Sequence, residues 1–150
     1  MVLLPGRGEP ALTYARLGQR LAGDGYRVVT GPTTTDGLVP LLRSDPGARP
    51  LVIVGADTGA LTALSAASSE NGVAGVVLAG PATTDPVGTG AATKKTASID
   101  DWDEELDART ACPVHRKVLS SDPDVVRGAI WAPTPEPVPA GDPQVPVLVV

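Results

Sequence analysis

One carboxylate stands between two glycines in the segment PLVIVGADTGALTALSAASSE, residues 50–70. Asp57 is the centre of Gly-Ala-Asp-Thr-Gly, where a run of strand-forming residues passes directly into an alanine-rich stretch with helical spacing. Small residues two positions before and after a central residue let the backbone fold back sharply, as in a nucleophile elbow. N–H groups at the start of the following helix would then point at the side chain and stabilise negative charge there. The pattern predicts an exposed carboxylate beside an anion-stabilising site.

Two interpretations of Asp57 stay open at this point. One takes it as the nucleophile position of such a turn. The other takes it as a helix N-cap, because Asp is a favoured cap and Thr58-Gly59 opens a helix. The glycines of LPGRGE, near the start of the chain, indicate a Pro-Gly turn. Neither common phosphate-binding glycine motif is present, which disfavours a nucleotide-binding Rossmann domain.

Cys112 and His115 form a C-x-x-H pair, a spacing that can hold a metal. A closed zinc site would need further Cys or His residues, and the chain has only this one of each, so we predict no metal and no cofactor. We expect Cys112 to be a small buried apolar residue. We expect His115 to be a packed or surface histidine, and only geometry can decide whether it replaces a general base.

The acidic run DDWDEELD surrounds Trp102 and predicts a solvated helix face, with the indole packed against the body of the protein. It belongs to a long segment, about residues 81–143, that also holds a Thr/Gly-rich patch and a Pro-rich stretch. This segment interrupts the regular alternation of the rest of the chain. An insertion of this length between two strands predicts a cap, a lid or a mobile loop.

Apolar runs and helical spacing alternate along the remaining chain, which predicts an α/β fold with a mostly parallel sheet of about five strands and flanking helices. The predicted buried strands are residues 2–6, 26–31, 51–55, 73–82 and 145–150. The predicted helices are residues 11–25, with Tyr14, Leu17 and Leu21 on one face, then 38–43 and 58–69. The length fits a single domain over residues 1–150.

Several of these segments together resemble the α/β-hydrolase family. LLPGRG resembles the strand and oxyanion loop of that family, LVIVGADTGALTALSAA its elbow and following helix, and VAGVVLAGPA and VPVLVV later strands of its sheet. The resemblance implies that Asp57 takes the nucleophile position. It implies that the N–H groups of Arg7 and Thr58 form the oxyanion hole, with Gly6 in the same loop as a further substrate-binding candidate.

The chain also departs from the family pattern. The usual nucleophile is Ser, and Asp occupies the position in the haloalkane dehalogenase and epoxide hydrolase branches, where a Trp commonly follows it and this chain has Thr58. The family's later acid and later His have no counterpart before Val150. An Asp nucleophile alone could form a covalent ester, but hydrolysing that ester needs a base that activates water. The resemblance therefore implies an incomplete triad.

The function expected from this resemblance is hydrolysis of a small apolar ester or a related electrophile through the elbow. The alternative is a non-catalytic α/β-hydrolase-like protein for binding or assembly, which keeps the pocket without a complete triad. The sequence leaves open which of the two holds, and so whether the protein is an enzyme.

Composition narrows the classes of partner. Twelve Lys and Arg against 17 Asp and Glu give a net charge of −5, and aromatic residues are scarce, which argues against nucleic acid. No apolar run approaches the roughly 20 residues that cross a membrane, and the first residues lack a signal-peptide pattern. With a single cysteine, which fits a reducing compartment, we expect a cytoplasmic protein whose partner is a small-molecule substrate.

The final apolar run, VPVLVV, predicts a strand with an unpaired edge and an uncovered apolar face. Exposed apolar edges favour pairing with another chain. We therefore expect a homo-oligomer, or a second chain that completes the fold.

Overall fold

A parallel sheet forms the centre of the molecule. The computed structural model describes residues 1–32, 34–44, 49–69, 72–82, 101–132, 134 and 142–150. Five strands are hydrogen-bonded side by side in the order β2-β1-β3-β4-β5, and every pair is parallel. They are β1 (Val2–Leu4), β2 (Val29–Thr30), β3 (Leu51–Ala56), β4 (Val73–Ala79) and β5 (Val147–Val149). This confirms the predicted α/β class and the parallel sheet of about five strands.

The described helices agree unevenly with the predicted ones. They are η1 (Ala11–Tyr14), α1 (Ala15–Gly23), α2 (Thr35–Ser44), α3 (Thr58–Ser69), α4 (Trp102–Arg109), α5 (Pro113–Ser121) and η2 (Ala129–Trp131). The helix predicted at 58–69 is confirmed residue for residue as α3. The helix predicted at 11–25 is instead a 3-10 turn followed by α1. It contributes no buried residue, because its apolar stripe does not pack on the sheet.

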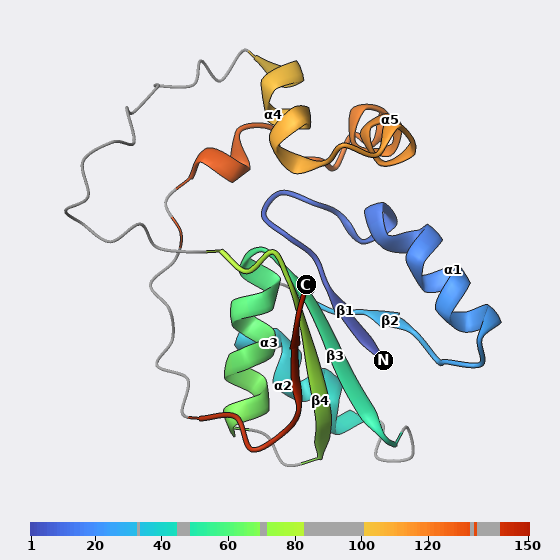
Figure 1. Ribbon diagram of the computed structural model, residues 1–150, viewed down its shortest axis with the longest axis vertical. Coiled ribbons are helices and arrows are strands. Elements are labelled where there is room, and N and C mark those ends of the chain that lie inside the picture. The colour runs from blue at the N-terminus through green and yellow to red at the C-terminus, as the bar shows by residue number, and fades with distance from the viewer. Residues whose placement is uncertain (33, 45–48, 70–71, 83–100, 133, 135–141) are drawn as a thin grey trace.

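The hydrophobic core lies between one face of the sheet and the helices α2 and α3. Alternate residues of β3 are buried, and Ile53 at the centre of the strand is fully buried. Successive side chains of a strand point to opposite faces, so this pattern means that one face is better covered than the other. The helix α3 contributes small buried residues such as Ala60 and Ala63, which let its axis approach the strands closely. Figure 1 shows α3 beside β4, with α2 next to α3.

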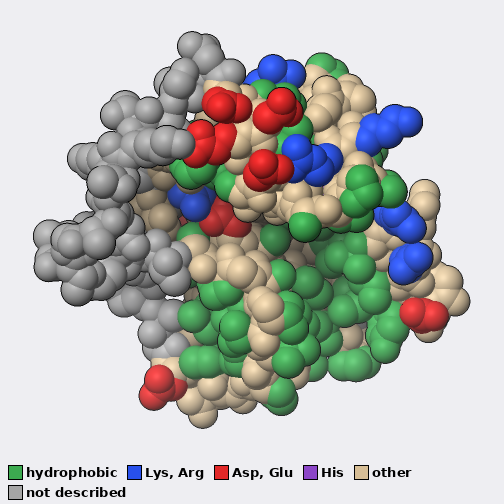
Figure 2. All heavy atoms as spheres, turned by 45° about the horizontal axis from the view of Figure 1, so that its top comes forward, with side chains coloured by type: hydrophobic (Ala, Val, Ile, Leu, Met, Phe, Trp, Pro, Cys, Tyr) green, Lys and Arg blue, Asp and Glu red, His purple; other side chains and the backbone are tan. Residues whose placement is uncertain are grey.

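The edge strand β5 contradicts the prediction that residues 145–150 form a buried strand, and among the described residues it agrees with the prediction of an unpaired edge and an uncovered apolar face. All three of its residues are exposed, and the exposed fraction rises from 39% at Val147 to 61% at Val149. It pairs with β4 on one side and is the last strand of the sheet on the other. Figure 2 shows hydrophobic side chains gathered over the lower half of the face in view, with charged side chains gathered above them. The strand predicted at 26–31 is likewise shorter and less buried, because only Val29 and Thr30 pair with β1.

Helices α4 and α5 lie beyond the carboxyl ends of the strands, at the top of Figure 1. The described part of residues 81–143 holds these two helices and η2, and no strand. The remainder of that predicted insertion, residues 83–100, 133 and 135–141, lies outside the described residues. The carboxylate of Asp101 caps α4 by accepting a hydrogen bond from the N–H of Glu104 at 3.1 Å. No described helix has the length and apolarity that a membrane crossing requires.

The acidic run is not the fully solvated face that its sequence predicts. Glu105, in the middle of α4, is only 2% exposed and forms an ion pair with Arg109. The sequence signal failed because one carboxylate of the run turns inward to a buried arginine one helical turn later. Trp102 is half-buried as expected, and the guanidinium of Arg127 lies 4.6 Å from the centre of its ring.

Candidate active site at the strand–helix turn

Asp57 occupies a sharp turn between β3 and α3. Its φ is 49°, in the left-handed region that residues with a side chain seldom adopt. The flanking glycines are required by close backbone contacts: a Cβ on Gly55 would lie 2.2 Å from the carbonyl oxygen of Gly59, and one on Gly59 would lie 2.5 Å from that of Leu4. The strand and the helix can therefore meet at this angle only with hydrogen in place of a side chain at both positions.

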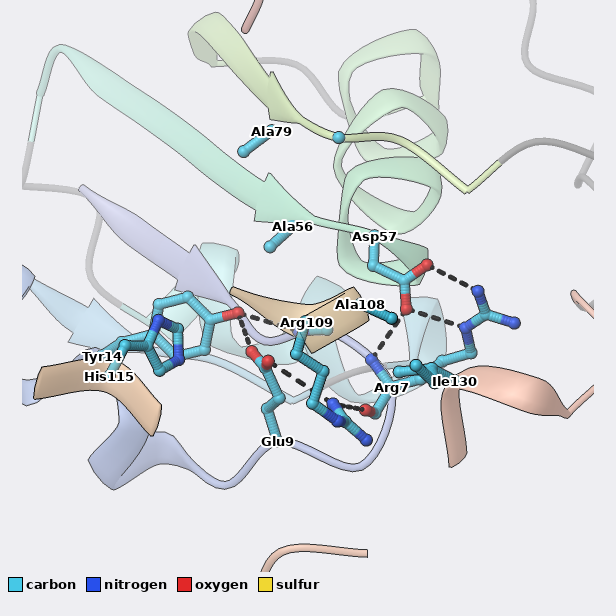
Figure 3. Close-up of a pocket in the computed structure, with 12 residues that line it drawn as sticks. Arg7, Glu9, Tyr14, Ala56, Asp57, Ala79, Ala108, Arg109, His115 and Ile130 are labelled. Carbon is cyan, nitrogen blue, oxygen red and sulfur yellow. Dashed lines mark hydrogen bonds and ion pairs between the residues drawn. The ribbon is translucent and has the colours of Figure 1, made fainter. Parts of the chain in front are cut away.

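This geometry distinguishes between the two interpretations of Asp57. An N-cap residue normally has extended backbone and accepts a hydrogen bond from an N–H two or three residues later. Asp57 has a left-handed backbone, and its carboxylate is held mainly by Arg7 of another loop, with a further hydrogen bond from the N–H of Thr58. The turn thus has the backbone form of an elbow, with its side chain directed toward Arg7 (Figure 3).

The carboxylate of Asp57 is bound on both oxygens by Arg7. The Arg7 Nε donates to Oδ2 at 2.8 Å, and Nη2 donates to Oδ1 at 2.9 Å, so the ion pair is bidentate. The backbone N–H of Arg7 also donates to Oδ2, at 3.0 Å. The remaining guanidinium nitrogen, Nη1, donates to the carbonyl of Ala132 at 2.8 Å, which links the pair to the segment after η2.

These contacts set the protonation of Asp57. Burial by itself would raise the pKa of the carboxyl group. The hydrogen bonds and the charge of Arg7, with a further hydrogen bond from the Thr58 N–H, outweigh burial and hold the pKa below its usual range. Asp57 is therefore a carboxylate at neutral pH, and its negative charge is compensated by one guanidinium.

The backbone N–H groups that were predicted to bind an oxyanion or substrate donate to two different side chains. The N–H groups of Arg7 and Thr58 both donate to the Asp57 carboxylate, so they converge on the same side chain. The N–H of Gly6 points elsewhere and donates to the hydroxyl of Tyr14 at 3.1 Å. The first two amides therefore converge on the carboxylate oxygens of Asp57, whereas the Gly6 N–H is paired with another side chain.

The pair borders a cavity of about 420 Å³, within the usual size range of small-molecule sites. Residues of the loop after β1, of η1, of the ends of β3 and β4, and of the helices α4, α5 and η2 surround it. The lining residues are Gly6, Arg7, Glu9, Tyr14, Ala56, Asp57, Ala79, Gly80, Ala108, Arg109, His115 and Ile130. The walls therefore include both the strand ends and the helices above them.

A second polar group lies across the cavity from Asp57. The hydroxyl of Tyr14 donates a short hydrogen bond to Glu9, and burial beside this carboxylate raises the pKa of Tyr14 well above its usual value. In Figure 3 the ring of His115 lies next to Tyr14, away from Asp57. Its Nε2 is buried and has no hydrogen-bond partner among the described residues. His115 thus lines the same cavity as Asp57 without being hydrogen-bonded to it.

Arg109 connects the helices above the sheet to the loop that carries Arg7. Its Nη2 donates to Glu105 at 2.7 Å and its Nη1 donates to the carbonyl of Arg7 at 2.8 Å. The other oxygen of Glu105 accepts from the N–H of Gly128 at 2.6 Å. This buried network holds the peptide group between Arg7 and Gly8, the one that directly follows the Arg7 amide.

The prediction that Cys112 is buried is wrong. It is the exposed N-cap residue of α5, where the nearby backbone N–H groups of His115 and Val114 hold the pKa of the thiol below its usual value. A residue at this helix end lies outside the packed interior, which is the physical reason for the difference. Within the described ranges, no group of three Cys, His, Asp or Glu residues is placed to hold a metal.

Several site residues were not predicted from the sequence. The side chain of Arg7 was not expected to bind Asp57, and Glu9, Tyr14 and Arg109 were not assigned to the site at all. Arg7 and Asp57 are 50 residues apart, and no local spacing signals such a pair. The sequence signal for these residues was weak. Arg7 and Glu9 are charged residues, separated by Gly8, in a loop that directly follows a buried strand. Ligand sites of parallel sheets occur at such strand ends.

Comparisons of this chain with protein-family models, with curated proteins and with solved structures find no match. The function of the protein is therefore inferred from the geometry of the site.

Proposed function

We propose that this chain is an α/β-hydrolase-like protein that hydrolyses a small apolar ester or a related electrophile through Asp57. The observation that supports the proposal is the elbow: a carboxylate on a left-handed turn, with two backbone N–H groups on the carboxylate and a cavity of about 420 Å³ beside it. A preorganised pair of amides costs no rearrangement when charge develops.

The chemistry proceeds in two steps. An oxygen of the Asp57 carboxylate bonds to an alkyl carbon of the substrate while the bond from that carbon to its leaving oxygen breaks, which forms an aspartyl ester. Where the leaving oxygen is an alkoxide, as in an epoxide, it takes a proton from water. Water then attacks the carboxyl carbon of the resulting aspartyl ester. The ester carbonyl oxygen becomes an oxyanion, and the N–H groups of Arg7 and Thr58 stabilise it. The attacking water gives its proton to a base, and the product alcohol leaves with a proton in return.

The base is the limiting feature of this proposal. His115 lines the cavity and is the candidate base, but it does not hydrogen-bond to Asp57. We therefore expect slow turnover, in which the second step is slower than the first.

Heavy-oxygen labelling tests the proposal. The protein is incubated with epoxybutane, a small apolar electrophile, in water enriched in heavy oxygen. After proteolysis, mass spectrometry measures the mass of the peptide that contains Asp57. Attack of water on the aspartyl ester leaves one heavy oxygen in Asp57, whereas direct hydrolysis of the substrate leaves none. The matched control is Asp107→Asn, which removes a carboxylate from an exposed ion pair with Arg116. Labelling that requires epoxybutane and persists in the control supports the proposal, and diol formation without label in Asp57 rejects it.

A second candidate, a non-catalytic binding protein, is favoured by the Arg7 side chain. The guanidinium covers both oxygens of Asp57, including the one that would attack a substrate. A carboxylate compensated in this way is a poor nucleophile, and the cavity would then serve only to hold a ligand. This function would be favoured if an aspartyl ester forms neither in the wild type nor in Arg7→Met, where the carboxylate is uncovered.

The exposed edge of the sheet leads to a proposal about assembly. The residues of β5 are apolar and uncharged, and the strand has no neighbour on its outer side among the described residues. A second copy could extend the sheet at this edge. Sedimentation velocity should then show a dimer that Leu148→Lys dissociates, and a monomer at all micromolar concentrations would exclude this assembly. The cytoplasmic location stays a prediction from composition.

A further inference from the structure

A second cavity lies between η1 and α1 on one side and α5 on the other. Its volume is about 320 Å³, large enough for a small organic ligand. Tyr14 and His115 line both this cavity and the one at Asp57, so the two are separated by shared side chains. The remaining lining residues are Thr13, Arg16, Leu17, Arg20, Cys112, Val114 and Val118.

Two arginines of α1 give this cavity positive charge. Arg16 and Arg20 are four residues apart, so both lie on the helix face that borders the cavity. Neither forms an ion pair with a carboxylate in the part of the chain that the structure describes. Arg7 and Arg109, by contrast, are each held by an acidic side chain. The cavity therefore presents two guanidinium groups whose charge no described carboxylate neutralises.

The wall next to these arginines is apolar. Leu17 is 42% exposed and Val114 is 48% exposed, so both present apolar surface to water at this cavity. Val118 follows Val114 by one helical turn and continues the same apolar strip along α5. An alkyl chain placed along this strip would remove these side chains from water.

Two residues of the wall also carry polar atoms that are unpaired. The hydroxyl oxygen of Thr13 and the Nε2 of His115 are buried and have no hydrogen-bond partner among the described residues. Buried polar atoms are paired in the large majority of cases, so these two are exceptions, and the binding of an anion does not depend on them.

We propose that this cavity binds a small amphipathic anion, a carboxylate with a short alkyl chain. The guanidinium groups of Arg16 and Arg20 bind the carboxylate, and the chain lies against Leu17, Val114 and Val118. Arginine suits this role because its planar donors match the two oxygens of a carboxylate. The site uses no chemistry of Asp57 and is independent of the hydrolase proposal.

The single cysteine provides a direct readout. Cys112 lines the cavity, is exposed, and is the only thiol in the chain, so the whole-protein mass reports its alkylation by iodoacetamide without interference from another cysteine. Octanoate, used below its micelle concentration, is the probe. A bound ligand shields the thiol, and at ten times its dissociation constant it should slow alkylation about tenfold. Octanol, which has the chain without the charge, and acetate, which has the charge without the chain, should slow alkylation much less.

Variants separate the cavity from general electrostatics. Arg16→Gln/Arg20→Gln should weaken octanoate binding at least about tenfold. The matched control, Arg116→Gln/Lys117→Gln, removes the same charge from α5 outside the cavity. Rates are compared with and without octanoate within each variant, because Arg16 itself lowers the pKa of the Cys112 thiol.

Three outcomes overturn the proposal. The first is equal protection by octanol and octanoate, and the second is equal weakening in the two double variants. The third is association with phosphatidylglycerol vesicles but not with free octanoate, which would assign the two arginines to a membrane surface instead of a cavity. Circular dichroism of each variant establishes that it is folded before binding is compared.

Discussion

The two arginine–carboxylate pairs at the Asp57 cavity differ in their access to water. Arg109 and Glu105 each have a side-chain exposure of 2%, whereas Arg7 and Asp57 are 20% and 26% exposed. Removing one partner of a buried pair leaves an uncompensated charge that water cannot reach, but a partly exposed charge can be rehydrated. The first pair therefore holds the helices onto the Arg7 loop, and the second contributes less to stability. Similar pairs of side chains thus differ in their effect on stability because water reaches only one of them.

The largest effect is expected from Arg109→Met. This change leaves Glu105 charged and buried, and it removes the hydrogen bond to the Arg7 carbonyl, so the free energy of unfolding should fall by about 3–5 kcal/mol. Urea unfolding measures the loss. Arg116→Met, in an exposed pair, should cost less than about 1 kcal/mol. Equal losses in the two variants would refute the proposed difference, and Arg109→Met/Glu105→Leu should recover most of the stability.

The elbow should be sensitive to one methyl group. In Gly59→Ala the added Cβ would lie 2.5 Å from the Leu4 carbonyl oxygen, so α3 must shift, at a cost of about 2–3 kcal/mol. The matched control is Gly23→Ala in α1, where a Cβ would meet no atom within 4 Å. Thermal unfolding of both variants compares them, and a neutral Gly59→Ala would show that the turn is not tightly packed.

Arg7→Met should have a smaller effect on stability and a larger effect on reactivity. The partly exposed pair of Arg7 and Asp57 contributes about 1 kcal/mol to the free energy of unfolding, and water can solvate Asp57 when Arg7 is lost. If the hydrolase proposal holds, the uncovered carboxylate should react faster with epoxybutane, because its attacking oxygen is no longer occupied. Denaturant unfolding and the initial rate of ester formation are the measurements. A stability loss as large as that of Arg109→Met would contradict the proposed role of exposure.

The smallest effect concerns pH. The pKa of Asp57 is lowered in the folded protein, so its stabilising contribution is complete above the unfolded value of about 3.9 and is lost as the pH falls through the lower folded value. Wild-type protein should therefore lose more stability than Asp57→Asn between pH 5.5 and pH 3. The difference should stay below about 1 kcal/mol, because the pair is partly solvated. Urea unfolding at both pH values measures it, and identical pH profiles would mean that Arg7 does not hold this carboxylate in solution.

Local patterns were sufficient for much of the fold. The apolar run at 51–55 and the alanine-rich stretch at 58–69 predicted β3 and α3, because strand and helix periodicity are properties of neighbouring residues. The tight turn at Asp57 was predicted for the same reason, since Gly55 and Gly59 are close in sequence. Burial was predicted less well: β5 is apolar and α1 has an apolar stripe, but neither contains a buried residue, because burial depends on which other segments cover them.

The sequence by itself thus determined the parallel sheet, the elbow and the presence of a carboxylate at its tip. Only the tertiary structure decided what that carboxylate contacts. Arg7 reaches Asp57 because β1 and β3 are neighbours in the sheet, which brings the ends of two distant strands together. Glu105 is buried where its partner Arg109 bonds to the Arg7 loop and where the N–H of Gly128 reaches its carboxylate, and Cys112 is exposed at the end of α5. Ionic contacts between distant segments leave no periodic trace in a sequence, so their partners are set by the packing of the elements that carry them.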